Sequence, residues 1–510
     1  MGHVAMHRFA ALFSSLLVPA LLFSSDFRSG QAASAVIGQP SFSIASGGIT
    51  PTALSLAGGK LFVTDRGQRV LTFDLSRWLN SGRDKTESSG AFCLVCIENP
   101  SSVVPQSVIS GVSRISTYAN AVAIADPTNH RVLLWRDSRS ASAASGPDVV
   151  LGPGTEVGGV VSGRSLAEPI SVALDGHRLF VGDAGLHRVL IWNSLPATAT
   201  QPADVVLGQP DLGGTSNNVP GAGRIVRPSA LLSDGTNLFV ADAAAHRVLI
   251  FAPSDFPVSE RSVLNSATAV HGPFAPGTLV TIEGENLAGR TEVATDDGEH
   301  SLPGTLAGIE LLLNGRHLPL LSVSPDEIRC QMPYDLQGTD SASLVLREEI
   351  SPGHPLLSNA MAVDFRSASP GILAFAGPEP RAGMVVHVNS ETGETSSPVT
   401  AAEPAKPGQP IVLWASGLGY VVDADRSSHP VAGQPYAGEA GNVLMQVQAE
   451  IDGQPVEVVS AILPQHAIGI YQVQVVLPSG FPASPAAHLT ISQGDWKSNT
   501  VTVPIGNPIQ

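Results

Sequence analysis

Short apolar runs separated by turn residues recur through the first half of the chain. A typical copy reads LFVAD after a glycine turn, and RVLIF follows a few residues later. Apolar, β-branched runs bounded by Gly, Asp, Asn and Pro predict short β-strands. Between copies stands another apolar run, in SAVIGQP, FCLVCIE, PDVVLGP, ADVVLGQP and RSVLN. The pattern therefore predicts units of four antiparallel strands.

The unit is repeated four times. Its RVL phrase occurs in GQRVLTF, NHRVLLW, LHRVLIW and AHRVLIF, which begin at Gly67, Asn129, Leu186 and Ala245. A fixed period indicates one supersecondary unit used several times, and four-stranded units repeated radially form a β-propeller. Five intervening strands accompany four units. We therefore expect a strand from one end of the chain to complete a blade at the other end, which hides open sheet edges.

The pattern changes near residue 261. The stretch PGTLVTIEGENL alternates apolar and polar positions, and KPGQPIVLWASGLGY from Lys406 echoes it later. Asn314-Gly315 and Asp452-Gly453 each stand between apolar runs, and such pairs favour tight hairpins because both residues accept a positive φ. The second half therefore predicts two tandem β-sandwiches that divide near Pro370.

Two family resemblances follow from these stretches. LFVADAAAHRVLIF resembles an NHL repeat, and the likeness covers about residues 36–260; the second copy lacks its glycine turn. PGTLVTIEGENL resembles the first strand and turn of an IPT/TIG immunoglobulin-like domain. The series SVLNSA, LLSVSPDEIRCQMPYDL, SPGIL and LWASGLGY is similar to the Solibacter uncharacterised C-terminal domain, over about residues 261–507. These resemblances imply an exported bacterial protein and an architecture, but no chemistry, because NHL propellers serve unrelated functions.

The expected fold is all-β, an NHL-like β-propeller with four sequence repeats followed by two immunoglobulin-like β-sandwich domains. The expected parts are a signal peptide, the propeller, an IPT/TIG-like sandwich and a second sandwich, at residues 1–35, 36–260, 261–368 and 369–510. The signal peptide combines a basic start, an apolar run over residues 9–23 and a small-residue cleavage site at Ala33-Ser34-Ala35. An uncleaved N-terminal anchor is the alternative. We expect no membrane insertion after signal removal, and a secreted, cell-surface or periplasmic location.

Charge excludes one class of partner. The net charge is −16 and only 14% of residues are charged. Nucleic-acid binding depends on clustered Lys and Arg, so we expect no nucleic acid as partner.

Each repeat carries an Asp that ends one strand and an Arg that begins the next. The carboxylate can accept backbone N–H bonds and the guanidinium can reach it or a neighbouring blade. We predict structural roles for the eight residues Asp65, Arg69, Asp126, Arg131, Asp183, Arg188, Asp242 and Arg247. His130, His187 and His246 occupy equivalent positions and are the candidates should a metal bind. Gln68 interrupts that series, a capping role is ordinary there, and we expect no metal.

Other reactive residues have structural interpretations. Cys93 and Cys96 form C-x-x-C within a strand-like run, where packing is favoured over redox chemistry, and Cys330 is interpreted in the same way. Large aromatics at one repeat position predict blade packing, with a sugar-stacking platform as the alternative; they are Phe73, Trp135, Trp192 and Phe251. G-x-S-x-G, H-E-x-x-H and P-loop motifs are missing from the sequence. We therefore predict neither catalytic residues nor a cofactor.

Two functions remain. The favoured one is a non-catalytic binding or scaffold protein of the cell envelope or exterior, with a protein or polysaccharide ligand. Its propeller loops would make contact, and its sandwiches would serve as a stalk or second contact. The alternative is a secreted propeller enzyme, a carbohydrate lyase or hydrolase that could use a metal.

Overall fold

The structure is a computed structural model. It describes residues 26–39, 41–44, 49–57, 60–65, 69–75, 102–105, 115–137, 147–152, 160–215, 219–295, 298–336, 338–349, 355–389, 394–422 and 429–507. The fold is all-β, as predicted, with short 3-10 turns between some strands. In this part of the chain, no helix has the length and apolar character needed to cross a membrane.

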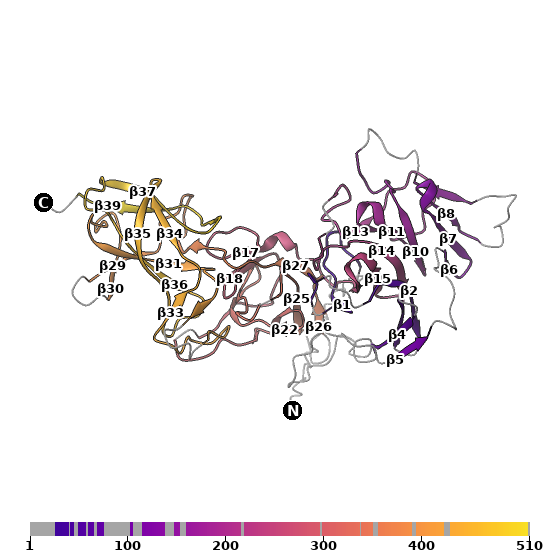
Figure 1. The fold of residues 1–510 in the computed structure, drawn as a ribbon, viewed down its shortest axis with the longest axis horizontal. Helices are drawn as coiled ribbons and strands as arrows, with labels where there is room; N and C mark the ends of the chain where they lie inside the picture. Colours follow the sequence, from indigo (N-terminus) through magenta and orange to yellow (C-terminus); the bar gives the residue numbers. More distant parts are fainter. Residues whose placement is uncertain are drawn as a thin grey trace, which may run out of the picture.

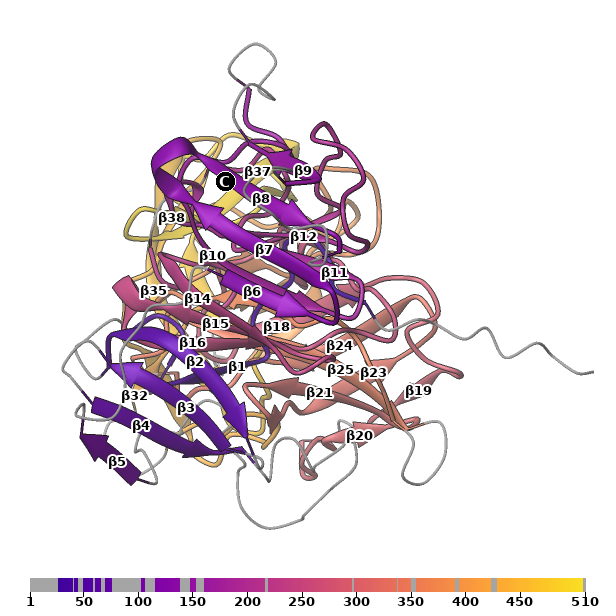
Figure 2. The ribbon, with the colours of Figure 1, turned by 90° about the vertical axis from the view of Figure 1, so that its right-hand side faces the viewer.

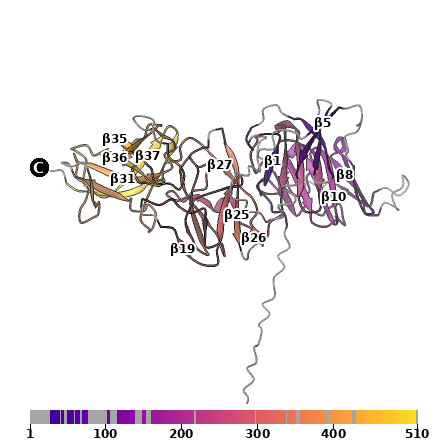
Figure 3. The same ribbon diagram turned by 90° about the horizontal axis from the view of Figure 1, so that it is seen from below.

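Three bodies lie in a row along the long axis (Figures 1 and 3). The propeller forms one end, the first sandwich lies in the middle and the second sandwich forms the other end. Chain order and spatial order therefore agree.

Four four-stranded antiparallel sheets form the blades of the propeller. The first blade contains β2 (Pro51–Ala57), β3 (Lys60–Asp65), β4 (Arg69–Asp74) and β5 (Ser102–Pro105). The second contains β6 (Ile115–Tyr118), β7 (Ala121–Asp126), β8 (Arg131–Trp135) and β9 (Val149–Leu151). The third contains β10 (Pro169–Asp175), β11 (Arg178–Asp183), β12 (Arg188–Trp192) and β13 (Val205–Leu207). The fourth contains β14 (Pro228–Ser233), β15 (Leu238–Asp242), β16 (Arg247–Phe251) and β1 (Ala35–Ile37).

The fourth blade takes its outer strand from the start of the chain, so the expected borrowed strand is confirmed. Ala35 pairs with Ile250, and Ile37 pairs with Val248. In the first blade, the outer strand is β5 instead of the predicted run FCLVCIE. That run, with Cys93 and Cys96, lies outside the described residues.

Neighbouring blades stand face to face (Figure 2). They pack apolar side chains together and share hydrogen bonds between their inner strands. Strands β12 and β16 are buried along their whole length because the RVLI sequence presents apolar side chains to both faces. Within the described residues, three junctions carry inner-strand bonds, namely Leu174 N–H to Ser116 Oγ (3.0 Å), Ser171 Oγ to Pro228 O (2.7 Å) and Ser229 Oγ to Pro51 O (2.7 Å).

The first sandwich packs two antiparallel sheets over one apolar core. One sheet contains β17 (Val263–Asn265), β18 (Leu279–Glu283), β24 (Glu327–Gln331), β23 (Leu320–Val323) and β19 (Glu292–Val293). The other contains β20 (Thr305–Leu306), β21 (Ile309–Leu313), β22 (Arg316–His317), β25 (Ser341–Glu349), β26 (Pro355–Leu357) and β27 (Met361–Asp364). The 3-10 turn η6 (Glu260–Ser262) precedes them.

The second sandwich is one sheet that folds over itself along β35 (Gln454–Pro464). One layer holds β28 (Gly371–Ile372), β29 (Val385–Val388), β30 (Thr395–Pro398), β31 (Pro410–Ser416), β32 (Val421–Val422), β33 (Ala440–Val443) and β36 (Tyr471–Val476). The other holds β34 (Gln448–Ile451), β37 (Ser484–Gln493), β38 (Trp496–Lys497) and β39 (Val501–Ile505). Both predicted tight hairpins are confirmed, with φ of 50° at Asn314 and 48° at Asp452.

Hydrogen bonds cross both seams between the bodies. At the propeller seam, Arg224 Nη2 lies 2.7 Å from Asp364 Oδ2, and Ala222 N–H donates to Ser341 Oγ (3.0 Å). At the second seam, Gly433 N–H donates to Gln331 Oε1 (2.7 Å). The bodies are therefore joined by packed, hydrogen-bonded surfaces.

Candidate functional site

The structure places each repeated Asp beside its Arg at the turn between two strands. The two residues of each pair are Cα partners in the sheet, at Asp65–Arg69, Asp126–Arg131, Asp183–Arg188 and Asp242–Arg247. Arg247 Nε lies 2.9 Å from Asp242 Oδ2, and Arg188 Nε lies 3.7 Å from Asp183 Oδ2; all four side chains are fully buried. In the second blade the pair is only partly buried, and Arg131 Nε lies 2.8 Å from Asp126 Oδ2.

These pairs hold the loops between blades. Asp183 accepts backbone bonds from Ala167 and Glu168, and Arg188 donates to the carbonyls of Ser162, Ser165 and Leu212. In the fourth blade, Asp242 accepts from the Val226 and Arg227 N–H groups. In the first blade, Asp65 accepts from Thr50 N–H (2.8 Å). In each of these hydrogen bonds, the partner of the Asp or Arg side chain is a backbone N–H or C=O group.

Burial and pairing shift the pKa values of these groups in opposite directions. Burial raises the pKa of Asp183, although backbone donors and Arg188 act against the increase. Burial also lowers the pKa of Arg188 and of Arg247. The hydrogen bond from Arg131 lowers the pKa of Asp126 at the surface.

The three repeated histidines link each blade to the next one. His187 Nδ1 lies 2.6 Å from Val226 O, His246 Nδ1 lies 2.9 Å from Ile49 O, and His130 Nδ1 contacts Ala167 O. A carbonyl only accepts, so each Nδ1 carries the proton. Each histidine has φ of 53°, a left-handed conformation that His adopts more readily than most residues. Across the described residues, no group of three His, Cys, Asp or Glu is placed to hold a metal.

The remaining candidate residues lie mostly in cores. Phe73, Trp192 and Phe251 are buried in the blades, and the Trp192 indole N–H donates to Gln201 O (3.1 Å). Cys330 is buried in the first sandwich, and desolvation raises its pKa to about 12.

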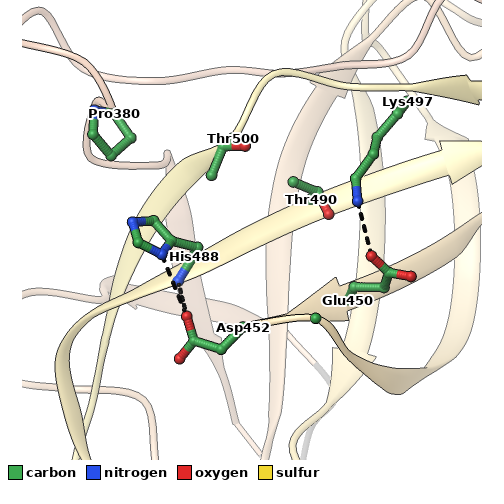
Figure 4. A pocket seen from close by; sticks show the side chains of 8 residues that line it. Pro380, Glu450, Asp452, His488, Thr490, Lys497 and Thr500 are labelled. Carbon is green, nitrogen blue, oxygen red and sulfur yellow. Dashed lines mark hydrogen bonds and ion pairs between the residues drawn. The ribbon is translucent and has the colours of Figure 1, made fainter.

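A concavity of about 580 Å³ lies on the solvent face of the second sandwich (Figure 4). It is a shallow, open surface lined by polar side chains. The lining consists of Pro380, Glu450, Asp452, Gly453, His488, Thr490, Lys497 and Thr500.

Strand alternation builds this surface. Glu450 lies opposite Thr490 across the β34–β37 pair, and Asp452 follows at the hairpin beside His488. The intervening residues Ile451, Leu489 and Ile491 point the other way, into the core. Successive side chains on a strand face opposite sides, so the polar residues gather on one face.

One ion pair and one imidazole–carboxylate contact flank Thr490 on this surface (Figure 4). Lys497 Nζ lies 2.9 Å from Glu450 Oε2, and His488 Nδ1 lies 3.5 Å from Asp452 Oδ1. All four side chains are more than 40% exposed, in a range where ion pairs contribute little stability. Their side chains are therefore available to a ligand. This set was not among the predicted site residues, and its signal in the sequence is the strand alternation in VQAEID and AHLTIS.

Comparisons with known proteins give distant structural likenesses. No protein-family model matches the chain, and no curated protein matches it. The computationally designed Ika4 protein matches 42% of this chain and 99% of its own at 14% identity, with a TM-score of 0.17. BamB from Moraxella catarrhalis matches 40% of this chain and 44% of its own at 16% identity, with a TM-score of 0.16. The I9–I11 tandem from titin matches 54% and 84% at 9% identity, with a TM-score of 0.14. At these scores none of them supports a conclusion about activity.

Proposed function

We propose that this chain is a non-catalytic binding protein of the cell envelope or exterior. The concavity on the second sandwich is its ligand site, and the propeller and first sandwich form the scaffold that carries it. The observation behind this proposal is the set of exposed polar side chains around Thr490, namely Glu450 with Lys497 and Asp452 with His488. They lie on a sheet at the end of an elongated body. We also propose that the first half of the chain is related to NHL-repeat propellers and the second half to the Solibacter uncharacterised C-terminal domain.

The site favours a neutral, hydroxyl-rich ligand such as a polysaccharide. It offers carboxylate acceptors in Glu450 and Asp452, an ammonium donor in Lys497 and hydroxyl groups in Thr490 and Thr500. With two carboxylates, one ammonium and a neutral imidazole, its formal charge is −1, and the whole chain carries −16. Both charges oppose a polyanion. Hydroxyl groups both donate and accept, so they match this mixed lining.

Contacts in the propeller favour binding over the enzyme alternative. In its metal-dependent form, that alternative needs the imidazoles of His130, His187 and His246 to share one metal ion. Each Nδ1 instead bonds to a carbonyl on a different loop.

Affinity electrophoresis through gels containing soluble neutral polysaccharides tests the proposal, with a polyuronate gel for comparison. We expect retardation by at least one neutral polysaccharide. The double variant Glu450→Gln, Asp452→Asn should abolish retardation, because it removes both carboxylate acceptors. Asn at position 452 keeps the left-handed hairpin conformation, so the hairpin is maintained. Glu457→Gln removes one negative charge at an exposed position on β35 and should retain binding. Absence of retardation throughout, or equal retardation of the double variant, would refute the assignment.

A further inference from the structure

The segment Asp26–Ser34 precedes the first strand and is packed into the fold; we name it the clasp. Gly30 N–H donates to Val206 O in the third blade (3.0 Å), and Ser34 N–H donates to Ile250 O in the fourth (2.6 Å). Asp26 and Ser254 exchange two backbone bonds. The clasp therefore bridges two blades.

Phe27 anchors the clasp. Its ring is 1% exposed and meets Phe180 edge-on, with ring centroids 6.0 Å apart. The Arg178 guanidinium lies 5.2 Å from the Phe27 centroid, a cation–π distance. Aromatic side chains bury a large apolar area and contribute strongly to the stability of a core.

The clasp also reaches the first sandwich. Ala32 N–H donates to Ala360 O there (2.9 Å), and Ala33 N–H donates to Ala222 O (2.8 Å) on the loop between the third and fourth blades, which itself contacts that sandwich at Ser341. Ala32 and Ala33 are fully buried. Small side chains allow this close approach, so the residues that resemble a cleavage signal serve packing in the folded chain.

We propose that the clasp is retained in the mature protein, and that any export peptidase cuts on the N-terminal side of Asp26 instead of after Ala35. Hydrolysis adds one water across the peptide bond, leaving a carboxylate on the released segment and an α-ammonium on the mature chain. A cut after Ala35 would put that ammonium on Val36, which is 0% exposed within β1. Burial of an unpaired charge is strongly unfavourable.

The same cut would remove Phe27 and all the clasp contacts. It would also shorten β1 from three residues to two. The inference is independent of the ligand site, so either can fail without the other.

N-terminal sequencing and intact mass of the full chain, exported by a bacterial host with its own leader and purified from the exported fraction, test the proposal. We expect the mature chain to begin at Asp26 or earlier. A start at any later residue overturns the proposal.

Thermal unfolding of two directly expressed chains gives a second test. The chain of residues 36–510 should melt about 5 °C or more below the chain of residues 26–510, or fail to fold. Within the longer chain, Phe27→Ala should lower Tm, and Arg28→Ala, at an exposed clasp position, should leave it unchanged. Equal Tm values for the two chains, or for Phe27→Ala and its parent, would contradict the role of the clasp.

Discussion

His187 on the third blade donates from its Nδ1 to the carbonyl oxygen of Val226 on the loop entering the fourth, over 2.6 Å. The histidine holds φ of 53° at the end of the 3-10 turn η4 (Ala184–Leu186). His187 thus joins neighbouring blades through two properties: its backbone tolerates the left-handed conformation, and its ring donates a hydrogen bond. The same arrangement recurs at His130 and His246.

Substitution of His187 should separate these two properties. His187→Gly keeps the backbone conformation and loses the hydrogen bond, so the free energy of unfolding should fall by about 1 kcal/mol. His187→Ala adds left-handed strain and should lower it by about 2 kcal/mol. His177→Ala, on the exposed β10–β11 turn, is the matched control. Urea unfolding measures all three, and a neutral His187→Ala would contradict the blade-linking role.

Loss of one partner from a buried ion pair should lower the free energy of unfolding strongly. Arg247→Met leaves the Asp242 carboxylate buried without its guanidinium and should lower the free energy of unfolding by about 3–5 kcal/mol. Arg290→Met breaks the exposed pair with Glu292 and should change it by less than about 1 kcal/mol. Denaturant unfolding of both variants checks the contrast; similar small losses would show that the buried pair is dispensable.

Alkaline pH should weaken the seam between the sandwiches. Desolvation raises the pKa of Tyr334 to about 12 and raises that of Tyr471 well above its usual value. Their stabilising contribution is complete below the unfolded pKa of about 10 and is lost as pH rises further, because the unfolded chain releases protons first.

Urea midpoints between pH 8 and pH 11.5 measure this loss. The Tyr334→Phe, Tyr471→Phe double variant starts from lower stability, because Tyr471 donates to Gly419 O (2.7 Å). It should nevertheless lose less stability than the parent between pH 10 and pH 11.5. If the urea midpoints of parent and variant fell in parallel with pH, the loss of stability would come from groups other than Tyr334 and Tyr471.

The glycine before Tyr420 should not tolerate a side chain. Gly419 has φ of +80°, and a Cβ there would stand 2.2 Å from Ser367 O on the segment between the sandwiches. Gly419→Ala should lower the free energy of unfolding by about 2–4 kcal/mol through backbone strain and overpacking. Gly480→Ala, with nothing within 4 Å of the added atom, is the control. Thermal unfolding distinguishes the two, and equal Tm values would refute the steric account.

Substitution on the ligand surface should hardly change the stability of the fold. Lys497→Met breaks an exposed pair with Glu450, and the free energy of unfolding should change by less than about 1 kcal/mol. Differential scanning calorimetry checks this. A larger loss would mean that the pair holds the sandwich together and is not free for a ligand.

Local patterns in the sequence predicted much of the fold. The repeat at Asp183 and Arg188 marked the turn between two strands, and Asp452-Gly453 marked a hairpin, because both signals depend only on neighbouring residues. The ligand surface was not predictable in this way. Glu450, His488 and Lys497 meet only after β34, β37 and β38 pair, and polar alternation alone marks every solvent-facing sheet.

Two signals in the first hundred residues were ambiguous. FCLVCIE has the composition of a strand, yet Ser102–Pro105 pairs with β4, because pairing register depends on partners that composition does not reveal. Ala33 and Ala35 have the small side chains typical of a signal-peptide cleavage site. Small side chains are also typical of close packing, and both residues are buried.

The pairing of β1 with β16 imposes an order on folding. Ala35 leaves the ribosome long before Ile250, so the first strand must remain unpaired until nearly the whole propeller has been synthesised. Contacts between residues so distant in sequence form slowly, because the chain loses loop-closure entropy before the contacts stabilise it. The last blade therefore completes only after both of its contributors, β1 and β16, have been synthesised.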